Sequence, residues 1–387
     1  MGIPKQIAEI TEQDLEALKA AVIREGKTIE YKERINIDSD DQKRKFVASI
    51  ASFANAAGGD LVFGMQADSG MPKQIVPLQN FNPDRDIRTL RDMVRAHIDP
   101  PLFGVEFKEM PVQGGMALVV RVPRAWDGAH MVTYNNDCRF YTRDANGRVL
   151  MNVPEIRSSF TTTEIRADRI RRLRLERLSL IRSKELPVTL QDGAILVLHL
   201  FPMRSFEPGI SYDLLPFVEG TSFQPMQVLS GWAHFHDLDG VYVADRMQDD
   251  SCRGYSAILR TGCIEVVQRT GPEKLIPNPG LESSFLKFFP RCVTWLRALG
   301  IEPPVIVMLS LLDIGGHSLY FGSGRFMFER RLIKHRDLIL HDVFVQTFET
   351  PVAEILRPFC DSIWHACGLM RSFNFDEAGN WKPQNWE

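Results

Sequence analysis

Helical and strand-like spacings of apolar residues alternate along the first sixty residues. In residues 11–26, apolar side chains recur at helical spacing, with a threonine able to cap the helix and a glycine able to end it. Residues 27–33, KTIEYKE, alternate polar and apolar side chains, as a half-exposed strand does. From Asp40 an apolar stripe predicts a second helix that ends at a Gly-Gly pair.

The next hundred residues predict strands and turns around one more helix. DLVFGM (60–65) is typical of a buried strand, and ADSG (67–70) of the turn after it. Residues 86–97 fit a helix that ends before two prolines. Two hairpins are expected, one over 103–124 around a Gly-Gly turn and one over 130–144 around NNDC.

A long basic helix is predicted after these strands. Residues 164–186 have helical spacing, and between Arg166 and Lys184 they hold eight Arg or Lys against two acids. Beyond Pro187 the pattern predicts strands at 194–203, 240–246, 255–269 and 305–312, a helix broken near Pro290, and a last helix at 351–367.

This order of elements predicts an α+β protein with two domains. We expect an N-terminal domain of mixed sheet and helices at 1–163, a basic connecting helix at 164–187, and a second α+β domain at 188–387.

Composition narrows the class of protein only slightly. The net charge of −3 gives no overall basic signature, so a nucleic-acid surface would have to be local. The six cysteines are scattered without a C-x-x-C pair, and Cys360 and Cys367 suit buried structural thiols. No apolar run approaches the ~20 residues that span a bilayer. A soluble protein of the reducing cytoplasm is expected.

The segment REGKTIEYKE (24–33) contains Gly-Lys-Thr, the end of a phosphate-binding loop. The loop motif requires a glycine five positions before Gly26, where Ala21 stands. A phosphate loop also runs from strand into helix, whereas here a helix precedes the glycine. Nucleotide binding at this loop is therefore disfavoured.

The same segment can instead gather carboxylates. Strand alternation places Glu30 and Lys32 on one face, and Gly26 permits a turn that brings Glu25 back beside Glu30. Asp68, after the buried strand, is a third acid. Converging carboxylates suit Mg²⁺ or Mn²⁺, which polarise phosphate and activate water. The alternative is a cross-strand charge pair and a solvated Glu25.

Three ordered blocks resemble the Schlafen-type AlbA_2 domain. They are EGKTIEYKE, FVASIASFANAAGGDLVFGMQADSG and FYTRDANGRVLMNVPEI, within residues 15–160. The resemblance implies a metal-dependent endoribonuclease that cuts structured RNA such as tRNA. It implies Glu25, Glu30 and Asp68 as metal ligands, with Asp60 as a weaker substitute for Asp68, and Lys32 as support for the phosphate.

The resemblance also implies partners and a setting. Animal Schlafens build their groove from two lobes and this chain supplies one, so a homodimer is expected. A role as toxin or antiviral effector would suit such an enzyme. The alternative is a non-catalytic module that binds RNA or DNA, or a regulatory protein whose C-terminal domain engages a partner protein.

Clustered cations predict a second contact with nucleic acid. The basic helix could follow a phosphate backbone, or it could be a solvated helix with its apolar side against the core. Arg143, in FYTRD, could face the same groove or pair with a surface acid. The predicted contacts are Arg143, Arg166, Arg169, Arg171, Arg172 and Arg174.

The segment HFHDLDG (234–240) is a weaker metal candidate. His234 and His236 would share a strand face, with Asp237 and Asp239 close by. A turn before the following strand explains the Asp and Gly residues equally well.

Overall fold

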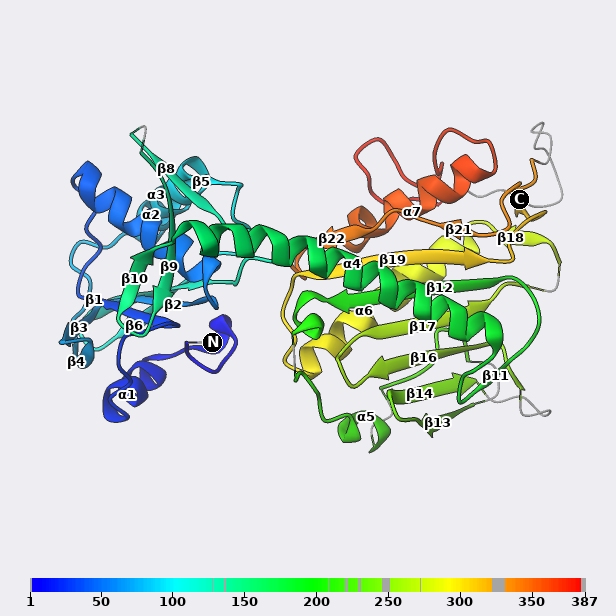
Figure 1. Cartoon of the computed structure of the whole chain (residues 1–387), viewed down its shortest axis with the longest axis horizontal. Helices are drawn as coiled ribbons and strands as arrows, with labels where there is room; N and C mark the ends of the chain where they lie inside the picture. Colours follow the sequence, from blue (N-terminus) through cyan, green and yellow to red (C-terminus); the bar gives the residue numbers. More distant parts are fainter. Residues whose placement is uncertain are drawn as a thin grey trace. The chain divides into compact units, whose positions relative to one another are not determined.

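The chain divides into two compact units, residues 1–166 and 167–387. The computed structural model describes residues 2–126, 128–135, 137–207, 209–219, 222–228, 231–245, 251–271, 273–321 and 331–383. The division lies within a single helix, α4 (Val153–Ser183), which therefore belongs to both units. Figure 1 shows the elements of each unit. The α+β class is confirmed.

A four-stranded mixed sheet forms the centre of unit 1. Its order is β1 (Ile29–Lys32), β2 (Gly59–Phe63), β7 (Gly115–Val122), β6 (Glu106–Val112), and only the pair β1–β2 is parallel. The helices α2 (Asp40–Asn55) and α3 (Pro83–His97) cover one face. The helices η1 (Ile7–Glu9) and α1 (Glu12–Ala20) cover the other. Adjacent residues of β2, Leu61 and Val62, belong to opposite cores, as strand alternation requires.

A smaller antiparallel sheet packs beside α2. Its order is β10 (Gly147–Leu150), β9 (Asp137–Asp144), β8 (Met131–Tyr134), β5 (Ile98–Asp99), and β8 and β9 of this sheet contact α2. The hairpin of β3 (Met65–Asp68) and β4 (Met71–Ile75) forms a separate two-stranded sheet. Its turn residues Ser69 and Gly70 both have positive φ, at 52° and 77°, as a tight hairpin turn requires.

Unit 2 is built on an antiparallel sheet of eight strands. The α4 helix covers one face of this sheet, and α6 (Gly280–Ala298) and α7 (Val352–Ala366) cover the other (Figure 1). Alternation along β12 separates the faces, because Leu196 and Leu198 pack under α6 and α7 while Val197 packs under α4. The sheet order is β13 (Trp232–His236), β14 (Gly240–Asp245), β16 (Gly254–Leu259), β17 (Ile264–Arg269), β12 (Ile195–Pro202), β19 (Val305–Leu312), β21 (Leu338–Ile339), with β22 (Val343–Val345) also on β19.

Shorter elements complete unit 2. These are η2 (Met203–Phe206), α5 (Leu215–Glu219), the parallel pair β11 (Thr189–Leu190) with β15 (Ser251–Cys252), and the parallel pair β18 (Leu275–Pro277) with β20 (Ser318–Tyr320). Cys360 and Cys367 are free and buried, as predicted.

Three predicted helix boundaries were wrong. The α1 helix ends at Ala20 rather than near Gly26, because Val22 has φ 50° and leaves the helical conformation. The α6 helix continues through Pro290, since the face around that residue is held by buried aromatic side chains. The α4 helix begins at Val153, before the predicted residue 164. Among the described residues, no helix is both long and apolar enough to cross a membrane.

Candidate functional site

Glu30 lies at the centre of a charged cluster in unit 1. Its neighbours Ile29 and Tyr31 belong to the core under α1, so Glu30 faces the side of the sheet that α2 covers. One carboxylate oxygen lies 2.7 Å from Lys32 Nζ and the other 2.6 Å from an Arg143 nitrogen. The predicted placement of Glu30 and Lys32 on one strand face is confirmed.

Arg143 is buried beneath α2. Its guanidinium lies 4.0 Å from the centre of the Phe53 ring, and its Nε donates to the carbonyl of Gly26 at 3.1 Å. Ser49 and Ser52 are the α2 residues beside it, and small side chains at these positions leave room for the guanidinium. With a side chain 1% exposed, Arg143 acts on this surface through Glu30 and was wrongly expected to line an open groove.

Arg148 completes the cluster and was missed in the sequence. It stands directly opposite Arg143 in the β9–β10 hairpin and donates to the Lys45 carbonyl at 2.6 Å and to Ser49 Oγ at 3.1 Å. The Asn146-Gly147 pair signals a hairpin at this point, but the turn residues are Ala145 and Asn146, and it is this register that places the two arginines opposite each other.

We call Glu30, Lys32, Arg143 and Arg148 the Glu30 cluster. Burial raises the pKa of the Glu30 carboxyl, but the charges of Lys32 and Arg143 outweigh it, so the pKa lies below its ordinary value. Burial lowers the pKa of Arg148, and the Glu30 charge opposes that effect. Arg143 and Arg148 carry like charges directly across a strand pair and repel one another. The Glu30 carboxylate is the one negative charge among the three cations of the cluster. The cluster therefore carries an excess of positive charge.

Glu25 covers the free edge of the sheet. The Gly26 turn was expected to bring Glu25 beside Glu30; it brings it back to β1, where its carboxylate accepts the backbone N–H of Tyr31 at 2.7 Å. Gly26 N–H donates to the carbonyl of Ile29 at 3.0 Å on the same edge, and Glu25 N–H donates to Gly70 at 2.7 Å. Because β1 is an edge strand, these bonds satisfy groups that would otherwise be open to another chain.

The remaining acids have other partners. Asp68, at the end of β3, is 67% exposed and lies 3.3 Å from Lys73 Nζ. Asp60 is fully buried, accepts two hydrogen bonds from Arg121 at 2.8 and 2.9 Å, and accepts the Ile3 N–H at 2.7 Å. Asp60 therefore anchors the N-terminal segment and does not replace Asp68.

The predicted metal site of Glu25, Glu30 and Asp68 is not assembled. Within the described part of the chain, no three Asp, Glu, His or Cys side chains lie where they could hold a metal ion together. Glu30 is neutralised by two cations, Glu25 holds the backbone of Tyr31, and Asp68 pairs with Lys73. This donor set, as it is arranged, does not fit a shared Mg²⁺ or Mn²⁺.

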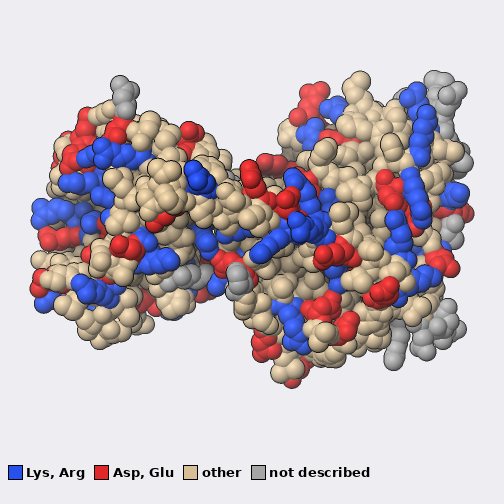
Figure 2. All heavy atoms as spheres, viewed as in Figure 1, with Lys and Arg blue, Asp and Glu red and all other residues tan. Residues whose placement is uncertain are grey.

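The basic helix is divided between surface and interior. Arg169, Arg171 and Arg172 are exposed, and Lys and Arg side chains mix with Asp and Glu over α4 in Figure 2. The Arg166 guanidinium lies 4.8 Å from the centre of the Trp126 ring. Arg174 is buried, and donates to Ser310, to the carbonyls of residues 309 and 340, and to Asp342. The predicted nucleic-acid contact by Arg174 was therefore wrong.

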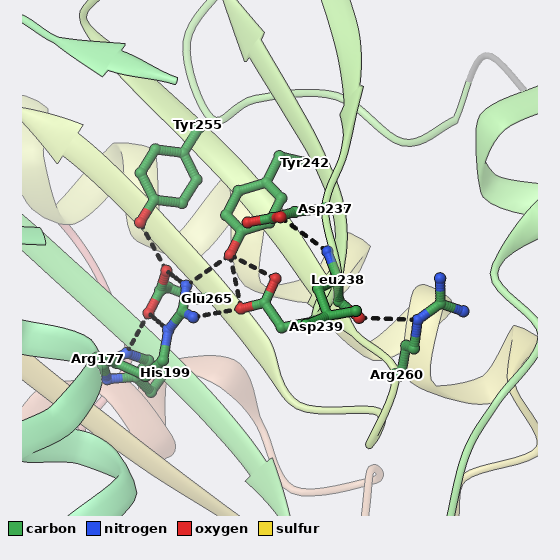
Figure 3. A network of polar contacts seen from close by, with 9 residues as sticks. All are labelled: Arg177, His199, Asp237, Leu238, Asp239, Tyr242, Tyr255, Arg260 and Glu265. Carbon is green, nitrogen blue, oxygen red and sulfur yellow. Dashed lines mark hydrogen bonds and ion pairs between the residues drawn. The ribbon is translucent and has the colours of Figure 1, made fainter. Parts of the chain in front are cut away.

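Arg177, one turn further along α4, enters a buried polar network (Figure 3). It donates to Glu265 at 2.9 and 2.7 Å, to Asp239 at 2.5 Å and to the Tyr242 hydroxyl at 2.8 Å. The segment HFHDLDG does not present a metal site, because Asp239 accepts a hydrogen bond from Arg177. The Asp237 N–H donates to the Gly240 carbonyl at 3.0 Å and closes a turn. The turn interpretation of that segment holds.

The family model described as Schlafen, AlbA_2 matches residues 25–152. The Glu30 cluster lies inside this span, so the surface described above belongs to a Schlafen-type AlbA_2 domain. No curated protein matches the chain.

Two solved structures match part of the chain. The DIP2311 protein of Corynebacterium diphtheriae matches at 16% identity and a TM-score of 0.27, over 36% of this chain and 29% of that one. The N-terminal domain of a RecG-related protein of Nitrosomonas europaea, described as an ATP-dependent DNA helicase relative, matches at 28% identity and a TM-score of 0.25, over 30% of this chain and 74% of that one. This chain thus spans less than a third of the first protein's length. At these TM-scores neither match supports a functional argument.

Proposed function

We propose that the AlbA_2 domain binds nucleic acid through its phosphate backbone, with the Glu30 cluster as a phosphate contact. One observation carries the proposal: the single carboxylate of Glu30 lies among three cations, and one of them, Lys32, is about half exposed. Lys and Arg donors are the groups that bind phosphate oxygens in proteins. The family to which the domain belongs supports a role with nucleic acid.

Within the cluster, each side chain has a distinct task. Lys32 and Arg148 offer donors at the surface, while buried Arg143 holds Glu30 in place. Glu30 in turn reduces the repulsion between Arg143 and Arg148, so the two arginines can stay opposite each other without a ligand.

Salt-dependent binding tests this proposal. Binding of tRNA and of duplex DNA to the full chain is followed by fluorescence anisotropy over a series of salt concentrations. Lys32→Ala and Arg148→Gln should each weaken binding and lower the slope of log K against log salt by about one, because each removes a phosphate contact. Arg85→Ala is the matched control, since it removes an exposed cation that pairs with Asp86 at the start of α3. If Lys32→Ala, Arg148→Gln and Arg85→Ala all keep the wild-type salt slope, the Glu30 cluster does not contact the nucleic acid.

A metal-dependent endoribonuclease is the second candidate for the same site. It is supported by the pair Glu25 and Glu30 of the segment EGKTIEYKE, because the Gly26 turn brings Glu25 onto the strand that carries Glu30. The donor arrangement of the described residues does not fit a divalent ion. Incubation of tRNA with Mn²⁺ separates the candidates: cleavage that Glu30→Gln abolishes supports the nuclease, and binding without cleavage supports the binding domain alone.

Pairing of two copies is a further part of the proposal. A homodimer would supply a second AlbA_2 domain to one RNA. The mass of the free protein, measured by light scattering after gel filtration, decides this, and a monomer alone and with RNA contradicts it.

A further inference from the structure

A cavity of about 410 Å³ lies in unit 2, at one end of the central sheet. It is lined by the end of α4, the loop before β12, the end of β17 and the end of β19. This volume is within the range of small-ligand sites, about 300–1,000 Å³. The cavity has no residue in common with the Glu30 cluster.

The lining of the cavity has an excess of positive charge. It includes four Lys or Arg side chains and two Asp side chains, which leaves two positive charges in excess. The cations are Arg182, Lys184, Arg269 and Lys274, and the acids are Asp192 and Asp313.

Ion pairs account for most of these charges. Asp192 lies 2.7 Å from Lys184, Asp313 lies 2.8 Å from Arg336, and Arg182 lies 2.7 Å from Asp337. Arg269 and Lys274 are the other two cations. Arg269 donates to the carbonyl of Asp192, and the Lys274 side chain makes no ion pair or hydrogen bond with any residue in the described ranges. Arg269 and Lys274 are therefore the cations that a bound anion would meet.

Gly193 sets the position of Arg269. Its φ is 143°, and a Cβ at this position would lie 2.7 Å from Arg269 Nε. Glycine thus lets the guanidinium lie against the loop backbone at the wall of the cavity.

Another part of the cavity lining is made of apolar residues of the core. Ile181, Leu190 and Leu312 line the cavity and belong to the cluster between α4 and the sheet. These three side chains are 1, 4 and 2% exposed and offer little apolar surface, so a ligand is selected mainly by an anionic group that meets the two cations.

We propose that this cavity binds a small phosphate-bearing molecule of mononucleotide size. The phosphate meets Arg269 and Lys274, and the rest of the molecule occupies the space between the end of α4 and the loop before β12. Arginine and lysine are the usual protein partners of phosphate, and the volume excludes a folded polymer.

Titration calorimetry of the full chain with AMP, adenosine and inorganic phosphate tests the proposal. AMP should bind, and adenosine should bind at least about tenfold more weakly because it lacks the anion. Lys274→Ala and Arg269→Gln should each weaken AMP about tenfold. Lys287→Ala, an exposed lysine of α6 outside the cavity, should leave AMP binding unchanged.

Several outcomes overturn the assignment. These are equal binding of AMP and adenosine, no AMP binding at millimolar concentration, and an AMP affinity that Lys274→Ala and Arg269→Gln do not change. Loss of AMP binding in Lys32→Ala but not in Lys274→Ala would place the nucleotide at the Glu30 cluster instead. A short 5′-phosphorylated RNA that binds more tightly than AMP, and is weakened by Lys274→Ala, would replace the mononucleotide by an RNA end.

Discussion

Replacing Glu265 by Gln should destabilise unit 2 strongly. The Glu265 carboxylate is fully buried and accepts four hydrogen bonds (Figure 3). Two come from Arg177 at 2.9 and 2.7 Å, one from His199 Nε2 at 2.9 Å and one from the Tyr255 hydroxyl at 2.6 Å. Gln keeps the size of the side chain but removes its charge, so the buried guanidinium loses its strongest partner.

Two independent arguments give the loss of folding free energy expected for Glu265→Gln. Breaking a buried ion pair by removing one partner costs about 3–5 kcal/mol, and Asp239 still pairs with Arg177, which favours the lower end. Independently, burial raises the Glu265 pKa, but hydrogen bonds from Arg177 and His199 outweigh it and lower the pKa from 4.5 to about 2. That difference corresponds to about 3 kcal/mol of folding free energy. A loss of this size is a large part of the ~5–15 kcal/mol that holds a domain folded.

Urea unfolding followed by tryptophan fluorescence measures the loss, since Trp295 and Trp364 are buried in unit 2. Glu349→Gln is the matched control: Glu349 also pairs with an arginine, at 3.1 Å, but its side chain is 83% exposed. The control should lose less than about 1 kcal/mol.

A double-mutant cycle with Arg177→Met isolates the pair. The double variant should be at least about 2 kcal/mol more stable than the sum of the single losses predicts. A single-variant loss under about 1 kcal/mol, or a coupling within the ~0.5 kcal/mol expected of independent sites, would refute the reasoning.

Three further predictions concern the pH dependence of Glu265 and the buried side chains of Arg174 and Asp60. Because the folded pKa of Glu265 is lowered, its contribution is present above pH 4.5 and is lost as pH falls toward about 2, so the stability difference between wild type and Glu265→Gln should shrink over that range. Arg174→Met should lower the free energy of unfolding by about 2–4 kcal/mol without changing RNA affinity, whereas Arg172→Ala should leave stability unchanged, as urea unfolding and anisotropy can check. Asp60→Asn should destabilise unit 1 by about 3 kcal/mol, because it leaves Arg121 buried without its carboxylate; a thermal melt of unit 1 that does not move would contradict this.

Local patterns predicted the longer strands of both units but few of the short ones, and residues 255–269, expected as one strand, form the antiparallel pair β16–β17. Alternation placed Glu30 and Lys32 on one face, and Gly-Gly and Asn-rich turns predicted the hairpins β6–β7 and β8–β9 of unit 1. These features depend on neighbouring residues only. The break expected at Pro290 failed because helix continuity there is decided by packing, with Phe289 and Cys292 buried on the sheet.

The charged residues were harder to place, since partners distant in sequence decide their roles. Arg174 is answered by residues more than 130 positions away, and Asp60 by Arg121, 61 positions away. A signal for the interior arginines did exist. Residues 170, 174, 177, 178 and 181 have the spacing of one helical face, so Arg174 and Arg177 lie on the apolar stripe of the basic helix.

Charge balance distinguishes Glu265 from Glu30, two of the buried carboxylates that pair with arginine. In unit 2, Arg177 is shared by Glu265 and Asp239, and the burial that lowers the pKa of His199 favours its neutral form, so that network leaves no positive charge over. In unit 1, Glu30 is alone among three cations, one of them about half exposed. A network with no excess positive charge has no cation to offer an anionic ligand, and its role is to fix α4 on the sheet. A network with cations in excess at the surface is completed by an anion, and this is why the Glu30 cluster, rather than the arginine-rich helix, is the better candidate for meeting phosphate.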